Sequence, residues 1–351
     1  MKSARAVAAP TFTPRRIFEQ LDRFVIGQAQ AKRTVAIAAY NHLKRCALRG
    51  PKKKLIKKSN VLMIGPTGCG KTHIARHLAE ILELPFTVCD ATEYTEAGYY
   101  GKDVEVMVAE LLFKADHSIE EAQRGIVFID EIDKIARRTQ GARNGAGSRD
   151  IGGEGVQQSL LKLLEGRDIF VPMNVTQHWN KHDFVQLDTQ DILFICAGTF
   201  TDIHTYEPEK SVGFGSKQKE KRRRITMKEL TEYGMLAELL GRLPVVVQLD
   251  LLSDDQLFEI LTVPPDSIVR EYTELLKLDD VELVFEEAAL REVVRYAGKR
   301  KLGARGLRSI LEEICHDVMY DAPERRGTRI VVDKAFVEKR TSQLDDVVLA
   351  E

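Results

Sequence analysis

The sequence has neither a strong imbalance of charge nor a long hydrophobic run. Its 52 lysine and arginine residues nearly balance its 53 aspartate and glutamate residues, which leaves a formal net charge of −1. The composition therefore gives no support to a protein that binds nucleic acid through its overall charge. No apolar stretch approaches the roughly 20 residues that span a bilayer, so no membrane partner is expected. The N-terminus, MKSARAVAAPTFTPRR, lacks the apolar core of a signal peptide.

Cysteine is scarce as well. The five cysteines stand at positions 46, 69, 89, 196 and 315, and no two of them form a C-x-x-C pair. This spacing indicates neither a zinc site nor a disulfide framework, so we expect no zinc and a cytoplasmic location. Apolar residues make up 44% of the 351 residues. The chain can therefore form packed cores, and its length suggests two domains.

The clearest motif is the stretch from Asn60 to Thr72, NVLMIGPTGCGKT. An apolar run typical of a buried parallel strand precedes a sequence that fits G-x-x-x-x-G-K-[ST] without a mismatch. The glycines allow the backbone to approach phosphate oxygens, which N–H groups of the loop and of the following helix can bind. Lys71 would reach the β- and γ-phosphates, and Thr72 would hold Mg²⁺ through its hydroxyl. We therefore predict ATP binding by Gly65, Pro66, Thr67, Gly68, Cys69, Gly70, Lys71 and Thr72.

A second apolar run, GIVFIDEID at 125–133, ends in acidic residues. At the carboxyl edge of a parallel sheet, where α/β proteins bind ligands, Asp130 would orient Mg²⁺ through a water molecule. Glu131 would polarise the water that attacks the γ-phosphate. Asp133 is interpreted as a helix cap.

The order of the patterns predicts the fold class. Apolar runs alternate with helical periodicity as far as residue 248, which predicts an α/β fold with a parallel five-stranded sheet and helices on both faces. The expected strands are 61–64, 86–89, 125–133, 192–196 and 243–249. A long surface loop is expected from Thr201 to Met227. The expected parts are a flexible tail at 1–15, a large nucleotide-binding domain at 16–248, a smaller helical domain at 249–340 and a C-terminal tail at 341–351.

Phosphoryl transfer gains from a cation at the γ-phosphate in addition to the loop lysine. Arg242 in GRLP and Arg305 in GARGLR are the candidates, although the pattern alone favours a surface ion pair for each.

Ordered stretches along nearly the whole chain resemble the AAA+ unfoldases of the ClpX type. They are VIGQ at 25–28, GPTGCGKT at 65–72, TEAGYYGKDVE at 95–105, RGIVFIDEIDKI at 124–135, GEGVQQSLLKLLEG at 153–166, GRLPV at 241–245 and KLGARGLRS at 301–309. The resemblance implies a homohexameric ring that hydrolyses Mg-ATP. Such a ring threads unfolded or tagged proteins through a central pore and delivers them to a separate ClpP-type peptidase.

The same resemblance assigns roles to individual residues. It implies that Val25 and Ile26 hold the adenine, that Arg242 is a finger given to the neighbouring subunit, and that Arg305 is a sensor in the lid formed by the small domain. Thr199 is our choice for the other sensor.

The resemblance also implies a pore loop and a docking loop. Tyr99 and Tyr100 match the aromatic–hydrophobic pore loop, and Val212, Gly213 and Phe214 stand for the Ile-Gly-Phe of the peptidase-docking loop. The N-terminal zinc-binding domain that the family usually carries has no counterpart in this sequence.

Two other classes stay open from the sequence. One is an AAA+ nucleic-acid motor or loader, which would use the basic stretches at 49–58 and 217–224, although no nucleic-acid module is recognised. The other is a stand-alone protein remodeller without a peptidase partner. Neither a Ser/His/Asp arrangement nor a HEXXH motif is found, so we expect an ATPase that is not itself a protease.

Overall fold

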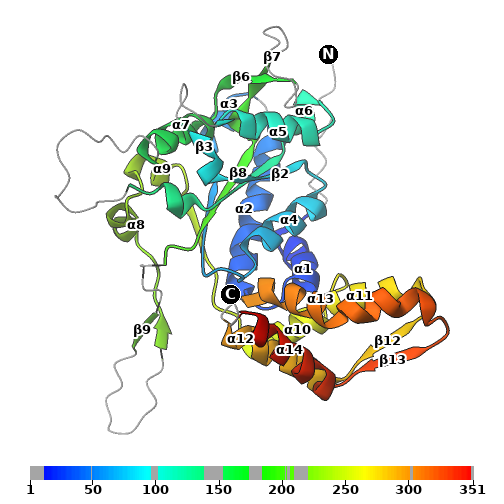
Figure 1. Ribbon diagram of the computed structural model, residues 1–351. Coiled ribbons are helices and arrows are strands. Elements are labelled where there is room, and N and C mark those ends of the chain that lie inside the picture. Colours follow the sequence, from blue (N-terminus) through cyan, green and yellow to red (C-terminus); the bar gives the residue numbers. More distant parts are fainter. Residues whose placement is uncertain are drawn as a thin grey trace. The chain divides into compact units, whose positions relative to one another are not determined.

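The chain forms two compact units in the computed structural model (Figure 1). The structure describes residues 12–48, 50–95, 102–137, 153–173, 184–201, 203, 206–208, 220–300 and 303–348. We call the first unit the sheet unit; it contains Met1–Phe18, Gln30–Gly65 and Lys71–Leu249. We call the second the helical unit; it contains Glu19–Ala29, Pro66–Gly70 and Asp250–Glu351.

Five parallel strands form the centre of the sheet unit. In spatial order they are β11 (Val245–Gln248), β1 (Val61–Ile64), β8 (Leu193–Gly198), β5 (Ile126–Asp130) and β2 (Phe86–Asp90). The register places Ile64 opposite Gly198 and Asp90 opposite Asp130. The carboxyl ends of the strands therefore meet at one edge, as the sequence predicted for a doubly covered parallel sheet.

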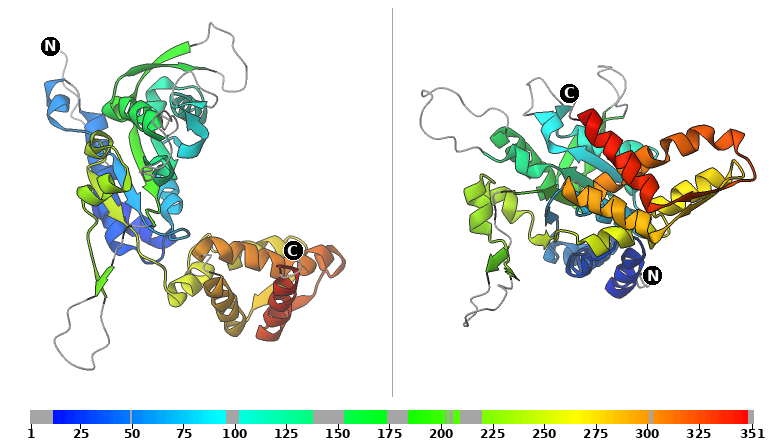
Figure 2. Two further views of the ribbon diagram at one scale, coloured as in Figure 1. Left: turned by 60° about the vertical axis from the view of Figure 1, so that its left-hand side comes forward. Right: turned by 60° about the horizontal axis from the view of Figure 1, so that its bottom comes forward.

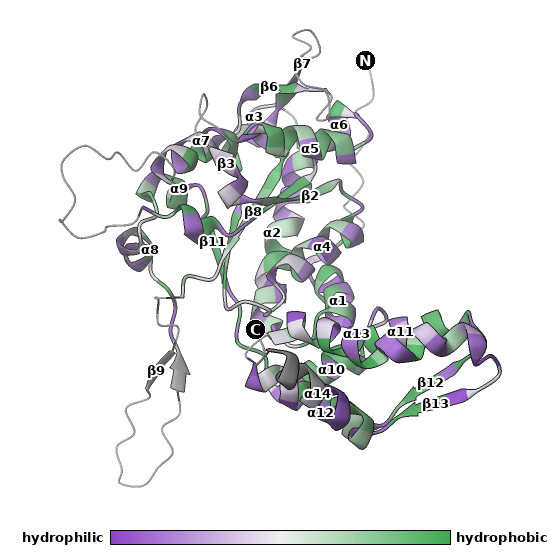
Figure 3. Cartoon of the chain, viewed as in Figure 1, coloured by the Kyte–Doolittle hydropathy of each residue, from purple (hydrophilic) through white to green (hydrophobic). Residues whose placement is uncertain are grey.

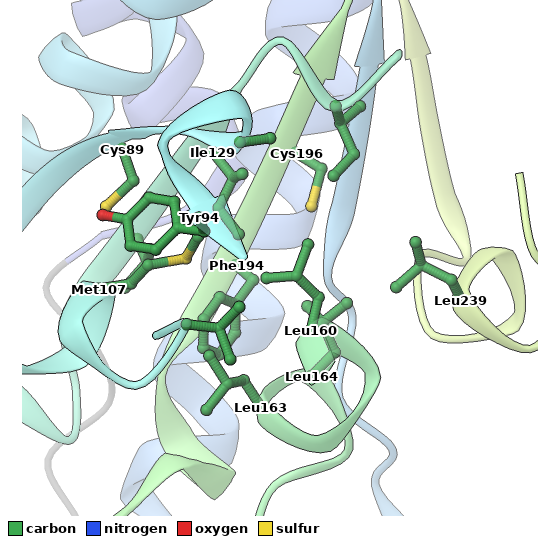
Figure 4. Close-up of a cluster of buried hydrophobic side chains, with 14 of the residues drawn as sticks. Cys89, Tyr94, Met107, Ile129, Leu160, Leu163, Leu164, Phe194, Cys196 and Leu239 are labelled. Carbon is green, nitrogen blue, oxygen red and sulfur yellow. The ribbon is translucent and has the colours of Figure 1, made fainter. Parts of the chain in front are cut away.

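Each face of the sheet packs against helices, which confirms the predicted α/β fold. Alternate strand residues such as Leu62, Val127 and Phe194 lie in one core together with α5 (Val106–Lys114) and α7 (Gly153–Glu165). In Figure 4 the leucines of α7 lie beside Phe194 and Cys196 of β8. On the other face α4 (Lys71–Leu82) contacts β5 and β8. Figure 2 shows the sheet and its helices from two further sides, and in Figure 3 the helices carry both hydrophilic and hydrophobic colours.

The first 241 residues contain further helices, 3₁₀ turns and strand pairs. α1 (Pro14–Phe24) and α2 (Ala29–Ala47) are separated at 25–28. The other helices are α3 (Pro51–Leu55), α6 (Ile119–Ala122), α8 (Met227–Tyr233) and α9 (Ala237–Gly241), with 3₁₀ turns η1 (Ala91–Glu93), η2 (Ile132–Ile135) and η3 (Thr189–Asp191). Strand pairs that the sequence did not predict are β3 (Tyr94–Thr95) with β4 (Lys102–Asp103), and β6 (Asp168–Pro172) with β7 (Phe184–Asp188).

One expected loop contains regular structure. β9 (Tyr206–Pro208) and β10 (Glu220–Arg222) form an antiparallel pair inside the segment 201–227. The segment expected to be a surface loop therefore includes a short strand pair that the sequence did not predict. An antiparallel pair of this length has too few residues to show an alternating pattern in the sequence.

The helical unit packs its helices around a core of its own. Its elements are α10 (Asp254–Thr262), α11 (Ile268–Lys277), β12 (Glu282–Phe285), α12 (Glu287–Lys299), α13 (Gly303–Asp321), η4 (Ala322–Glu324), β13 (Arg329–Val332) and α14 (Lys334–Val348). The apolar stripe of α13, with Leu307, Leu311 and Ile314, is fully buried in this core. The segment 341–351, expected to be a C-terminal tail, is largely helical: α14 continues to Val348. The expected N-terminal tail at 1–15 also contains the start of a helix, since α1 begins at Pro14. Among the described helices, none is both long and apolar enough to cross a membrane.

Candidate functional site

The predicted Mg²⁺ ligands meet at the carboxyl edge of the sheet. The hydroxyl of Thr72, in the first turn of α4, donates to Oδ2 of Asp130 at the end of β5 over 3.3 Å. Lys71 is buried, and its Nζ donates to the carbonyl of Gly65 over 2.7 Å. Gly65 in turn donates its N–H to the carbonyl of Gly198 at the end of β8. A hydroxyl and a carboxylate side by side fit Mg²⁺, which takes few protein oxygens and keeps several waters.

Glu131 has an unusual backbone conformation. Its φ of 56° and ψ of 31° lie in the left-handed region, which non-glycine residues seldom adopt. Its N–H donates to Oδ1 of Asp130 over 2.9 Å, so both oxygens of Asp130 accept a hydrogen bond. The conformation ends β5 abruptly and leaves the Glu131 side chain exposed. Strained backbone of this kind is found preferentially at functional sites, where it costs about 1–3 kcal/mol.

Asp133 corrects an expectation. The interpretation of Asp133 as a helix cap is wrong, since Glu131 occupies the N-cap of η2 and Asp133 is buried. Its carboxylate accepts from the hydroxyl of Thr199 over 2.9 Å and from the Thr199 N–H over 3.2 Å. A Cβ on Gly198 would lie 2.7 Å from Oδ1 of Asp133, so this position requires glycine. Asp133 thus fixes Thr199 just beyond β8, a pairing that no local pattern in the sequence indicated.

The phosphate loop, Pro66–Gly70, belongs to the helical unit. Gly68 and Gly70 have φ values of 76° and 97°, which explains why glycine stands there. The carbonyl of Cys69 accepts from Nε2 of Gln28 over 3.4 Å. Gln28 also exchanges two hydrogen bonds with the backbone of Asp250, at 2.8 and 3.0 Å. Gln28 is a candidate site residue that sequence reasoning missed, although it is the last residue of the VIGQ motif at 25–28.

The start of α13 contacts the phosphate loop within the helical unit. The N–H of Ala304 donates to the carbonyl of Gly68 over 3.3 Å. A Cβ on Gly303 would lie 3.1 Å from the carbonyl oxygen of Thr67. Arg305 follows directly and is exposed in the first turn of α13. Of the two residues expected to hold the adenine, Val25 is buried and Ile26 is half-buried.

Arg242 lies away from the edge where β1 ends. It follows α9 and precedes β11, which places it at the amino edge of the parallel sheet. Its guanidinium donates to Glu165 over 2.8 Å, the ion pair that the sequence pattern alone favoured. Asn60, almost fully buried, holds the Arg242 backbone: its Nδ2 donates to the carbonyls of Arg242 at 3.0 Å and Leu164 at 3.3 Å.

The residues expected to form the pore loop and the docking loop lie outside the described residues. These are Tyr99 and Tyr100 in the first loop, and Val212, Gly213 and Phe214 in the second.

The basic segment at 50–58 makes internal contacts. Lys53 pairs with Asp191, and Lys58 donates to the carbonyl of Thr189 over 2.9 Å while lying 4.4 Å above the ring of Phe194. Burial lowers the pKa of Lys58 to about 7. These contacts fix the segment to η3, so Lys53 and Lys58 act in a structural connection.

Beside this segment, α2 buries His42. Its Nε2 lies 3.1 Å from the carbonyl of Arg124, and Cys46, one turn later, is 3.7 Å from the same nitrogen. Burial lowers the pKa of His42 to about 4, an effect that Lys58 and Arg45 reinforce and that the Arg124 carbonyl and Asp191 oppose. The imidazole is therefore neutral in the folded protein at neutral pH.

Comparison with known proteins agrees with this geometry. Residues 56–246 match the family described as AAA domain (Cdc48 subfamily), and residues 252–332 match the C-terminal, D2-small domain, of ClpB protein. The chain is similar to the ATP-dependent Clp protease ATP-binding subunit ClpX 2 of Wolinella succinogenes. The two are 43% identical over 326 residues, which cover 92% of this chain and 81% of the relative.

Proposed function

This chain belongs to the ClpX family of AAA+ ATPases, and we propose that it is the ATP-driven unfoldase of a Clp-type protease. It is an ATPase and not a protease. The observation that carries the proposal is the pairing of Thr72 with Asp130 next to the exposed Glu131 at the carboxyl edge of the sheet. A hydroxyl, two carboxylates and a loop lysine are the groups that nucleotide hydrolysis requires.

In the proposed mechanism each group of site residues binds a different part of the nucleotide. Thr72 and Asp130 would hold Mg²⁺, which supplies positive charge to the β- and γ-phosphates. Lys71 would exchange its hydrogen bond to Gly65 for one to a phosphate oxygen, and Glu131 would take a proton from the attacking water. The loop glycines would present their N–H groups to the phosphates, while Val25 and Ile26 would contact the adenine.

Two arginines would complete the site. Arg305 lies in the first turn of α13, next to Ala304, whose N–H donates to the carbonyl of Gly68, so it can respond to the nucleotide held by the same loop. Arg242 would act on the nucleotide of a neighbouring subunit in a homohexamer. Thr199, held by Asp133, would report the state of the γ-phosphate through β8.

ATP hydrolysis would drive translocation of a polypeptide through the pore of the ring. Tyr99 and Tyr100 would grip the chain, because flat aromatic side chains make apolar contact with any sequence. Val212, Gly213 and Phe214 would dock a ClpP-type peptidase that degrades the threaded protein. We expect these events in the cytoplasm.

The experiment measures ATPase rate and unfolding rate of a tagged fluorescent protein, with and without a ClpP-type peptidase. Tyr99→Ala should keep hydrolysis within about threefold, roughly 0.6 kcal/mol, while unfolding is lost. Unfolding by Tyr99→Ala at the parent rate would remove Tyr99 from the grip. Absence of peptidase binding by the parent would favour a stand-alone remodeller, whereas binding that survives deletion of 212–214 would remove that loop from the docking. ATPase stimulation by DNA with a steep salt dependence would favour a nucleic-acid motor instead.

A further inference from the structure

The short strands β3 and β4 flank the segment 96–101. They pair in parallel, with Tyr94 opposite Lys102 and Thr95 opposite Asp103. The Tyr94 side chain is buried in the core, where Figure 4 shows it beside Cys89 and Met107. The residue that precedes the segment and the residue that follows it therefore belong to one structured stem.

One lysine connects both ends of this stem to a helix. Nζ of Lys102 lies 2.9 Å from Oε2 of Glu93, before the segment, and 3.4 Å from Oε1 of Glu110 in α5. It also lies 5.9 Å from the centroid of the Tyr94 ring. Hydrogen bonding to Glu93 raises the pKa of Lys102, so the ammonium stays charged. We name Glu93, Lys102 and Glu110 the stem triad.

The stem triad is attached to the strand that pairs with β5. Cys89 of β2 lies 3.7 Å from Oε2 of Glu110. Asp90, the last residue of β2, pairs with Asp130, and its carboxylate accepts from Thr92 N over 2.8 Å at the start of η1. η1, which ends at Glu93, contacts η2, which follows Glu131.

We propose that the stem triad couples the nucleotide site to the segment 96–101, and that its three members are positioning residues for translocation. This inference rests on the proposed function, in which that segment carries Tyr99. A shift of Asp130 and η2 during hydrolysis moves β2 and η1. Lys102, which directly follows the segment, passes this movement to both of its ends, because it binds Glu93 before the segment and Glu110 of α5. Without the lysine the side-chain link between the two ends and α5 is lost, and less of the movement reaches the segment.

The test compares Lys102→Glu, Lys102→Arg and Lys114→Glu in assembled rings. Lys102→Glu places a third carboxylate beside Glu93 and Glu110, whereas Lys102→Arg keeps the charge and the reach. Lys114→Glu makes the same charge change at an exposed position of α5 with no ion pair among the described residues. The first readout is the number of substrate molecules unfolded per ATP hydrolysed. We expect Lys102→Glu to lower this ratio at least about fivefold, the lower end of usual coupling between sites, while both other variants keep the parent ratio.

A second readout is independent of unfolding activity. Hydrogen exchange of the peptide 93–105 is compared with a slowly hydrolysed ATP analogue and with ADP bound. The parent and Lys114→Glu should show a nucleotide-dependent difference that Lys102→Glu abolishes and Lys102→Arg keeps.

The two readouts separate failure of the inference from failure of the proposed function. A parent that unfolds no substrate overturns the proposed function, while the exchange data still decide on the coupling. A parent without nucleotide-dependent exchange, or a Lys102→Glu variant that keeps the parent difference or the parent ratio, overturns the inference. Equal losses in Lys114→Glu would assign the effect to net charge and overturn it as well.

Discussion

At the scale of single residues, Glu131 shows how the backbone exposes the carboxylate that we propose as the catalytic base. Its left-handed conformation and its hydrogen bond to Asp130 direct the chain away from β5 and leave the carboxylate exposed at the sheet edge. Glutamine has the same shape and can adopt the same backbone, but it cannot accept a proton from water. Loss of the base should therefore separate binding from hydrolysis.

We expect Glu131→Gln to bind ATP like the parent and to hydrolyse it at least about 10²-fold more slowly, the usual minimum for loss of a general base. Binding is measured with a fluorescent nucleotide and hydrolysis by phosphate release. Glu120→Gln, an exposed residue of α6, is the control. Hydrolysis by Glu131→Gln at the parent rate would exclude Glu131 as the base.

His42 gives a prediction about pH. Its pKa is lowered from 6.5 in the unfolded chain to about 4 in the folded one, chiefly by burial. The unfolded state therefore binds a proton that the folded state rejects. The associated stability, about 3 kcal/mol, is present above pH 6.5 and is lost as the pH falls toward 4.

The variant His42→Gln keeps a donor toward the Arg124 carbonyl and does not titrate. Its urea midpoint should fall less steeply than that of the parent between pH 6.5 and 4, the interval set by the two pKa values. His117→Asn, at an exposed histidine with a positive φ, should keep the parent slope. If the urea midpoints of the parent and of His42→Gln fall equally steeply with pH, His42 is not buried in its neutral form.

At the scale of elements, the side chain of Asn60 forms hydrogen bonds with three different parts of the sheet unit. Its side chain precedes β1 and bonds the carbonyls of Leu164 at the end of α7 and Arg242 after α9, and it accepts from the N–H of Phe194 in β8 over 3.3 Å. Each of these backbone groups would lose a partner if the amide were removed. An unsatisfied buried group costs about 1–3 kcal/mol.

Asn60→Ala should therefore lower the free energy of unfolding by at least about 2 kcal/mol, since three backbone groups lose their partner. It should also lower ATPase activity in assembled rings, because Arg242 loses its backbone anchor. Urea unfolding and phosphate release are the measurements, with Asn41→Ala at an exposed position of α2 as the control. Unchanged stability would mean that water replaces the amide.

At the scale of the whole molecule, the sheet separates Arg242 from the loop that follows β1. Val61 pairs with Val245 and Ile64 with Gln248, so β1 and β11 run side by side for four residues, roughly 13 Å. Arg242 lies before the start of β11, and the phosphate loop begins after the end of β1. An arginine at the amino edge cannot serve a nucleotide at the carboxyl edge of the same sheet.

Arg242 should therefore act on a neighbouring subunit. Rings of Arg242→Ala alone and of Lys71→Ala alone should be inactive, whereas mixed rings should regain part of the ATPase rate at hybrid sites. The rate is measured across mixing ratios, with assembly confirmed by light scattering. Absence of recovery at every ratio in assembled mixed rings would argue against action in trans.

The sequence by itself determined the features that depend on neighbours along the chain. The phosphate loop needs glycine at Gly68 and Gly70 for positive φ, and the central strands need uninterrupted apolar runs because helices cover both faces. The ordered motifs were sufficient to identify the family. The short pairs β3–β4 and β9–β10 gave no pattern, because two or three residues cannot establish a period.

The tertiary structure alone decided which polar groups meet. Gln28 bonds Asp250 across 222 positions, Asn60 bonds Arg242 across 182, and Asp133 holds Thr199 instead of capping a helix. Periodicity in a sequence indicates which face of an element is buried. It does not indicate which group a polar side chain will contact. That partner is set by the register of the strands and the packing of the helices, since a buried donor or acceptor must be satisfied wherever the fold places it.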